Sequence, residues 1–426
     1  MVLNYLWVGF ILVGFLVALI RLLGYYFRDL FADKLGIIFD KADLDVFSAM
    51  VDSTFTSAAT SVEIAIYLIG VMALWLGIMK IGEQGGAVHA LGRVVNPFFR
   101  RLFPEVPDNH PAMGSMLMNF SANMLGLDNA ATPLGLKAMH ELQSLNRKKD
   151  TASNAQIMFL VLNTSGLTIV PISIMAIRAA QGAANPADVF VPLIIVTFAS
   201  TMVGMIAVAL KQRINLLSRV VLAYILGSIL LVTGFVFYLQ QLTQEEMAAQ
   251  SRIIGHFILI MVIVSFLILG LRRKINLYES FIDGAKDGFK VAISIIPYLV
   301  AMLFAIGIFR ASGAMEMITG SIGRLVAALG LNTDFVPALP TAFMKPLSGS
   351  GARGMMVEAI QNFGVDHFVA RLSSIFQGST ETTFYTLAVY YGAVNVKKTR
   401  YTVGYGLLAD FAGIISAIFV AYLIFH

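Results

Sequence analysis

Apolar residues along this chain occur in blocks that are about as long as a bilayer crossing. A helix needs ~20 mainly apolar residues to cross a ~30 Å hydrocarbon layer. We therefore predict an all-α integral membrane fold with about nine spanning helices. The predicted spans are 5–23, 61–81, 155–180, 189–210, 220–239, 253–271, 291–310, 368–391 and 401–424.

Two further apolar stretches, 114–135 and 336–357, are interrupted by polar residues, glycine and proline. Backbone that is not helical is tolerated at membrane depth only where protein or a water-filled cavity shields it. These stretches therefore predict two re-entrant hairpins.

Composition agrees with a membrane protein. Of the 426 residues, 58% are hydrophobic and 13% are charged, against about 25% charged residues in soluble domains. The first span has no basic segment before it and no small-residue cleavage site after it, so we expect a retained helix and not a signal peptide. Cysteine is absent, which excludes disulfides, thiolate metal ligands and cysteine nucleophiles.

The distribution of positive charge predicts the topology. With the N-terminus in the cytoplasm, the inner loops hold 18 Lys and Arg and the outer loops hold 5, as the positive-inside rule requires. The C-terminus then faces outward, and the outer loop 24–60 carries six Asp. A net charge of +5 is weak evidence for nucleic acid, so we expect the lipid bilayer and no nucleic acid as a partner.

The chain also repeats itself. Each half has the order span, amphipathic stretch, broken hairpin, broken span, span, and the charge count makes 61–81 and 291–310 cross in opposite directions. Inverted repeats of this kind build many transporter folds, although two apolar segments can also look alike by chance. The echoed motifs are 77–80 and 307–310, 91–95 and 322–326, and 163–168 and 378–383. The predicted domains are 1–60, an N-terminal span and acidic outer loop; 61–215, the first repeat; 216–275, a two-span connector; and 276–426, the second repeat.

Four polar stretches, 118–133, 163–171, 345–353 and 377–383, lie within the apolar background. Glycine and proline interrupt helices there and leave backbone groups unpaired, and broken helix ends present partial charges near the midplane. Glu381 is a carboxylate in mid-span, which costs a few kcal/mol and calls for a partner or a wet cavity. Lys345 is the first candidate partner and Arg353 the second. The candidate substrate-binding residues are Asn123, Asp128, Asn129, Asn163, Thr164, Ser165, Lys345, Ser348, Ser350, Arg353, Gln377, Ser379, Thr380, Glu381 and Thr382.

Each of these residues has a simpler interpretation. Ser, Thr and Gly often mediate close packing of membrane helices, and a Lys345–Glu381 pair could only hold the hairpin against the span. Asp410 and Glu63 have no polar neighbourhood in the sequence, so we leave them out of the site. The six His show no ligand spacing and no phosphate-binding glycine loop is present, so we expect no metal, no cofactor and no enzymatic activity.

The motifs resemble known families. NMLGLDNAATPLGLKAMHELQ at 123–143 and FLVLNTSGLTIVP at 159–171 resemble spore maturation protein A. ESFIDGAKDGF at 279–289, KPLSGSGARG at 345–354 and FQGSTETTFYTLAVYYGAVNVKKTR at 376–400 resemble spore maturation protein B. The chain thus looks like a fused form built of two nucleoside recognition, or gate, domains. Such domains also occur in the membrane part of ferrous-iron transporter B and, in related form, in concentrative nucleoside transporters.

This resemblance implies a transporter-like or channel-like fold in the bacterial inner membrane, with a homo-oligomer as a further expectation. Our main hypothesis is a transporter or channel for a small polar solute or ion, nucleoside-like or cationic, bound at the midplane between the repeats. The alternative is an accessory membrane scaffold that does not transport and acts through protein partners.

Overall fold

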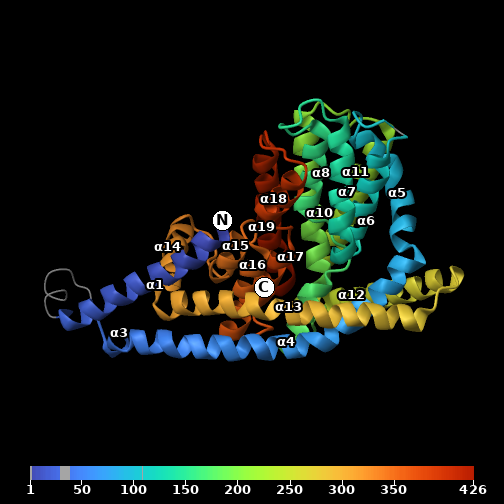
Figure 1. The fold of residues 1–426 in the computed structure, drawn as a ribbon. Coiled ribbons are helices and arrows are strands. Elements are labelled where there is room, and N and C mark those ends of the chain that lie inside the picture. The colour runs from blue at the N-terminus through green and yellow to red at the C-terminus, as the bar shows by residue number, and fades with distance from the viewer. Residues whose placement is uncertain (1, 29–38, 108) are drawn as a thin grey trace.

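The computed structural model describes residues 2–28, 39–107 and 109–426, and the described chain is built from helices (Figure 1). The helices of the first repeat are α4 (Val46–Gly85), α5 (Ala87–Leu102), α6 (Pro111–Met124), α7 (Asp128–Leu145), α8 (Asn154–Ser165), α9 (Ile172–Ala180) and α10 (Phe190–Lys211). Those of the second repeat are α13 (Leu277–Ala311), α14 (Ala314–Ala328), a short 3-10 turn (Val336–Ala338), α15 (Leu339–Met344), α16 (Gly349–Phe363), α17 (Phe368–Gly378), α18 (Thr383–Ala393) and α19 (Thr402–Phe425). The order of elements is the same in both halves, as the sequence predicts.

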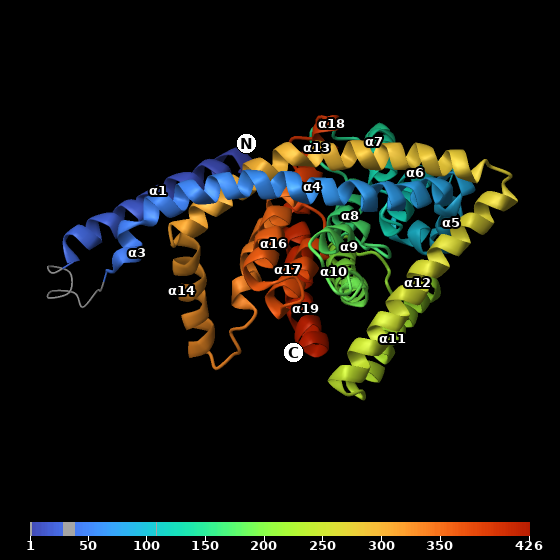
Figure 2. The same cartoon turned by 90° about the horizontal axis from the view of Figure 1, so that it is seen from below.

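Two long helices, α4 and α13, lie side by side along most of their length and run in opposite directions (Figures 1 and 2). Their backbones approach closely at Gly284 and Gly288, one turn apart on α13. A Cβ atom at Gly284 would fall on the carbonyl oxygen of Leu76, and one at Gly288 on that of Met72. Small residues spaced in this way allow close packing of membrane helices. The α4–α13 pair therefore joins the two repeats.

The remaining helices of the two repeats stand across this pair. In Figure 1, α8, α10, α18 and α19 run steeply to α4 and α13, and Figure 2 shows α10 and α19 closer to end-on. α10 and α19, the last helices of the two repeats, pack against each other. The long helices are therefore not one parallel bundle.

Four helices of the described residues lie outside the repeats. α1 (Val2–Tyr26) packs on α13, where the indole of Trp7 donates a hydrogen bond to Ala301 O (2.8 Å). The connector forms a hairpin of α11 (Arg219–Gln240) and α12 (Gln244–Arg272), which projects from the end of the α4–α13 pair (Figure 2). A short helix, α3 (Lys41–Leu44), precedes α4.

Within the described residues, seven helices are long and apolar enough to span a membrane: α1, α4, α10, α11, α12, α13 and α19. They coincide with seven of the nine predicted spans, and the chain is an all-α, multi-pass membrane protein. The other two predicted spans, 155–180 and 368–391, are each divided into two short helices, α8 with α9 and α17 with α18. The predicted polar stretches 163–171 and 377–383 fall at these breaks, and 118–133 and 345–353 fall at the hairpin tips between α6 and α7 and between α15 and α16.

The predicted loops near α4 and α13 are wrong in part. Residues 46–60, predicted as part of the outer loop 24–60, belong to α4, and residues 277–290, which lie before the predicted span 291–310, are the first turns of α13. α4 has 40 residues and is about 60 Å long at a rise of 1.5 Å per residue. The mutual packing of the pair keeps these more polar segments helical.

Candidate functional site

A cavity of about 230 Å³ lies where the breaks and hairpin tips of both repeats meet α4 and α13. Its polar lining includes Lys80 and Glu83 of α4, Thr168 of the first break, Ser173 at the start of α9, and Asp287 of α13. From the second repeat come Lys345, Arg353, Gln377, Thr380, Glu381 and Thr382. The site is thus assembled from segments up to about 300 residues apart in sequence.

The first break begins at Gly166, which ends α8 in the left-handed conformation (φ +63°). The chain then runs without helix to Pro171 before α9 begins. The hairpin tip between α6 and α7 contacts this segment, since Ile169 N donates a hydrogen bond to Met124 O (2.7 Å). The tip residue Gly126 (φ +71°) lies so close that a Cβ atom there would be 2.5 Å from Val170 O.

The second break, 379–382, is arranged in the same way. Phe384 N, in the first turn of α18 next to the break, donates to Pro346 O at the tip between α15 and α16 (3.0 Å). The side chain of Gln377 also donates to this tip, through Nε2 to Gly349 O (3.3 Å). Each break is therefore held by the hairpin of its own repeat through a backbone hydrogen bond.

The two breaks also contact each other directly. Glu381 N in the second break donates to Thr164 O at the end of α8 (2.8 Å). Gly166 makes room for this contact, because a Cβ atom there would lie 3.0 Å from Glu381 N. The carbonyl end of α8 thus meets a backbone amide of the second break. The side chain of Glu381 lines the cavity beside this contact.

Charges of both signs line the cavity. Lys80 pairs with Glu83 on α4 (3.1 Å). Lys345 and Glu381, the predicted pair, both line the cavity. A lining with both cations and anions suits a polar or zwitterionic solute better than a purely apolar one.

The side chains of several predicted site residues make hydrogen bonds to other groups of the protein. Asn123 donates to Asn163 Oδ1 (2.9 Å), and Asn163 donates to Phe159 O (2.8 Å), which ties α6 to α8. The hydroxyls of Thr164, Ser165 and Ser379 donate to carbonyls of their own helices. Ser348 caps α16 by accepting from Gly351 N and contacts Ser350. These residues fit the simpler interpretation of helix packing, and the side chains of Asp128 and Asn129 lie outside the described residues.

Lys80, Glu83 and Asp287 were not predicted as site residues, because only the fold brings them to the cavity. Asp410 was also left out of the predicted site. Asp410 is 2% exposed on α19 and accepts a hydrogen bond from Thr383 Oγ1 (2.7 Å). The sequence feature that could have identified Asp410 is a carboxylate in the middle of a predicted span.

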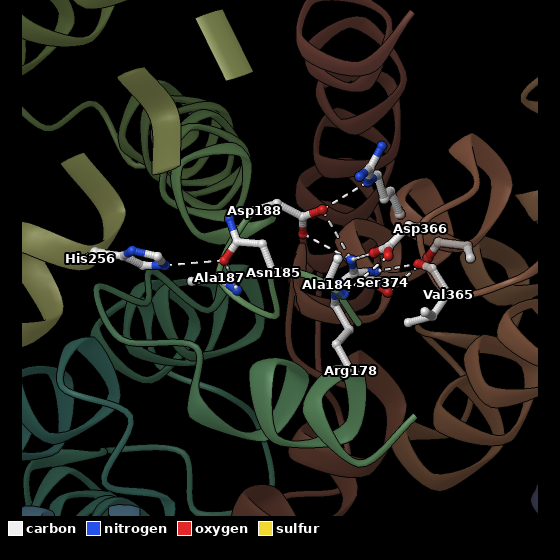
Figure 3. Close-up of polar contacts among 11 residues, drawn as sticks. Arg178, Ala184, Asn185, Ala187, Asp188, His256, Val365, Asp366 and Ser374 are labelled. Atoms are coloured by element: carbon white, nitrogen blue, oxygen red, sulfur yellow. Dashed lines mark hydrogen bonds and ion pairs between the residues drawn. The ribbon is translucent and has the colours of Figure 1, made fainter. Parts of the chain in front are cut away.

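A cluster of charges, the arginine cluster, joins the repeats at one end of the broken helices (Figure 3). It consists of Arg178 at the end of α9, Asp188 before α10, Asp366 before α17, and Arg371 on α17. Arg178 is fully buried and contacts Asp188 (3.0 Å) and Asp366 (3.3 Å), while Arg371 contacts Asp188 (2.8 Å). Arg178 also donates to Val365 O (2.9 Å).

A second connection, the loop clasp, joins the loops before α8 and after α18. Lys397 N and Lys398 N both donate to Asp150 O (2.9 Å each), and Ala152 N donates to Lys398 O (2.9 Å). Hydrogen bonding from Thr151 and the ammonium of Lys398 lower the pKa of the exposed Asp150 carboxyl below its ordinary value. The loop clasp and the arginine cluster lie at opposite ends of the broken helices, with the breaks between them.

Comparisons with known proteins agree with the organisation of the chain into two repeats. The sequence profile of the Gate family, described as nucleoside recognition, matches residues 65–181 and 292–397. Spore maturation protein B of Bacillus subtilis (strain 168) is 43% identical over 164 residues, which cover 38% of this chain and 90% of that protein. Spore maturation protein A of the same organism is 42% identical over 149 residues, which cover 35% of this chain and 76% of that protein. No solved structure matches the chain.

Proposed function

The chain belongs to the Gate, or nucleoside recognition, family, and from this premise we propose that it is a transporter or channel for a small polar solute or ion. The main observation in support is the hydrogen bond from Glu381 N in the second break to Thr164 O at the end of α8. It lies beside a cavity that is lined by charged and polar groups. Helix breaks in membrane proteins occur where the exposed backbone is shielded or lines a cavity. Two breaks from inverted repeats that meet at one cavity favour a solute site over a purely structural discontinuity.

In this proposal the α4–α13 pair is the fixed frame and the broken helices move against it. The arginine cluster closes one end of these helices and the loop clasp closes the other. Opening one connection while the other stays closed would expose the cavity to one side at a time. The charge distribution supports a cytoplasmic N-terminus in the bacterial inner membrane, with the loop clasp on the inner side.

Solute-dependent flux in proteoliposomes tests the proposal. Purified protein on a solid-supported membrane should give transient currents or tracer uptake with at least one member of a panel of nucleosides, amino acids and inorganic ions. Glu381→Gln removes a charge from the cavity and should lower the response by about tenfold, equivalent to roughly 1.4 kcal/mol. Glu279→Gln, a change at an exposed carboxylate of α13 outside the cavity, should leave the response unchanged. A panel with no response in the native protein would overturn the proposal.

A second candidate function is an accessory membrane scaffold. The names of the two relatives refer to spore maturation and to no transported solute, which favours a role in envelope assembly. This function predicts a stoichiometric protein partner on cross-linking in native membranes, and it predicts no solute-dependent response in the flux experiment.

A further inference from the structure

Asp410 is a buried carboxylate that the proposed solute cavity does not use. It lies in α19, one of the candidate spans, and is 2% exposed. Its Oδ2 accepts a hydrogen bond from Thr383 Oγ1, whereas its buried Oδ1 has no hydrogen-bond partner among the described residues. An ionised carboxylate at such a place is costly unless a cation neutralises it.

Side-chain and backbone oxygen atoms surround Asp410. Thr380 of the second break packs against α19 three residues from Asp410, since a Cβ atom at Gly413 would lie 3.0 Å from Thr380 Cγ2. Its hydroxyl oxygen is buried and, within the described part of the chain, accepts or donates no hydrogen bond. The same holds for the side-chain oxygen of Gln377, three residues earlier. The break after Gly378 also leaves backbone carbonyls without their helical partners.

The charge around Asp410 is low. Lys345 on the hairpin tip is the charged side chain that acts on the carboxylate electrostatically. The neighbouring parts of α8 and α10 present neutral hydroxyl residues, Thr164 and Ser200, both fully buried. Among the described residues no group of three or more His, Asp or Glu could hold a metal ion. One carboxylate with hydroxyl and carbonyl oxygens suits a hard monovalent cation, since divalent ions are held by more carboxylates or by waters.

We propose that Asp410, with Thr380 and Thr383, forms a binding site for Na⁺. Asp410 supplies the charge, and the oxygen atoms of Thr380 and Thr383 complete the polar shell. This inference rests on the proposed function and deepens it, because it names the coupling ion.

Thr380 connects the ion to the solute. It lines the cavity and also packs against α19 near Asp410, and Glu381 and Thr382 follow it in the cavity lining. Na⁺ at Asp410 would fix the second break in the form that presents Glu381 and Thr382 to the cavity. Ion and solute would therefore stabilise the same arrangement of the break, which is the requirement for coupled binding.

Equilibrium binding of ²²Na⁺ to the purified full-length protein in detergent tests the site, with choline as the replacing cation. The native protein should bind Na⁺ saturably, and Asp410→Asn should abolish binding. Thr380→Val keeps the shape of the side chain and removes one oxygen, so it should weaken binding by about fivefold to tenfold. Ser200→Ala is the matched control, because the Ser200 hydroxyl donates to Ala409 O beside the site (2.8 Å) without facing the carboxylate as a ligand. It should bind as the native protein does.

Saturable binding that is lost in Asp410→Asn and weakened in Thr380→Val supports the proposal. The absence of saturable ²²Na⁺ binding in the native protein overturns it, and so does equal binding by Asp410→Asn. If Asp410→Asn fails to fold, unchanged binding by Thr380→Val overturns it instead. A protein that takes up only protons, measured as pH-dependent proton uptake without Na⁺ binding, also contradicts the Na⁺ site.

The outcome of the ²²Na⁺-binding experiment is independent of the outcome of the flux experiment. Asp410-dependent Na⁺ binding without any solute-dependent flux would remove the transport function and leave the ion site. Solute flux without Asp410-dependent Na⁺ binding would leave the transport function and remove the ion site.

Discussion

Gly166 shows how a single residue places the contact between the repeats. Its left-handed backbone turns the chain out of α8, and the absence of a side chain lets Glu381 N reach Thr164 O. The sequence places a glycine within the polar stretch at 163–171, so a break there could be predicted. The atom that it contacts, more than 200 residues away, could not.

Gly166→Ala should destabilise the protein for two reasons. A left-handed conformation costs a residue with a Cβ atom about 1 kcal/mol, and the new Cβ would lie 3.0 Å from Glu381 N. Gly182→Ala is the matched control, since Gly182 has the same type of backbone (φ +76°) with nothing within 4 Å of an added Cβ. We expect a larger drop in the thermal unfolding temperature for Gly166→Ala than for Gly182→Ala. Equal drops would mean that the contact with the second break contributes nothing.

Arg178 is the residue of the arginine cluster whose loss should be most costly. Arg178→Met leaves Asp188 with Arg371 as its remaining ion-pair partner, and no cation replaces the lost guanidinium. Breaking a buried ion pair by removing one partner costs about 3–5 kcal/mol. The unfolding temperature of the purified protein should fall clearly.

Lys286→Met is the control for this change, because the Lys286–Asp283 pair is largely exposed (66% and 62%) and exposed pairs contribute little. If the two variants unfold at the same temperature, the arginine cluster does not hold the repeats together in the way described here.

The candidate site was predictable only in part. Gln377, Thr380 and Glu381 stand out as polar residues in an apolar block, and they do line the cavity. Asn163 and Ser379 carry the same pattern but donate to carbonyls of their own helices. Donor and acceptor types alone do not distinguish these outcomes, because the local helix offers its carbonyls as readily as a cavity offers water.

At the scale of elements, the breaks and hairpins were predictable because glycine and proline mark them. The length of α4 and α13 was not. Residues 46–60 contain Asp, Ser and Thr and have no apolar block of spanning length, yet they continue α4. Packing against α13 and α1 decides their structure, and tertiary contacts of this kind override local composition.

The close approach of α4 and α13 can be tested at Gly288. Gly288→Ala adds a Cβ that would meet the carbonyl oxygen of Met72, so the two helices must separate and lose packing contacts. Gly227→Ala on α11 has nothing within 4 Å and should be neutral or slightly stabilising, as Ala favours a helix over Gly. Thermal unfolding should show a lower midpoint for Gly288→Ala alone. A midpoint unchanged from the native protein would show that the two helices tolerate separation.

At the scale of the whole molecule, the inverted repeat is the feature that the sequence predicts best. Short echoed motifs and the order of spans indicate it, the family profile matches both halves, and α4 and α13 run antiparallel. The exact boundaries of the predicted domains stay a prediction. The steep angle between the α4–α13 pair and α10 with α19 could not be predicted, since hydropathy gives the length of a helix and not its direction.

The central claim is that the cavity between the breaks is a water-accessible site for a solute. The chain has no Cys, so single cysteines can be introduced without further changes. Thr382 lines the cavity and is 6% exposed, whereas Ser374 on α17 is fully buried and is not among the lining residues.

The most direct measurement is the rate at which a charged, membrane-impermeant methanethiosulfonate modifies Thr382→Cys in vesicles of each orientation, with Ser374→Cys as the reference. If water reaches the cavity, Thr382→Cys reacts from both sides of the membrane and faster than Ser374→Cys. A Thr382→Cys protein that reacts from neither side, or no faster than Ser374→Cys, would contradict a water-accessible site.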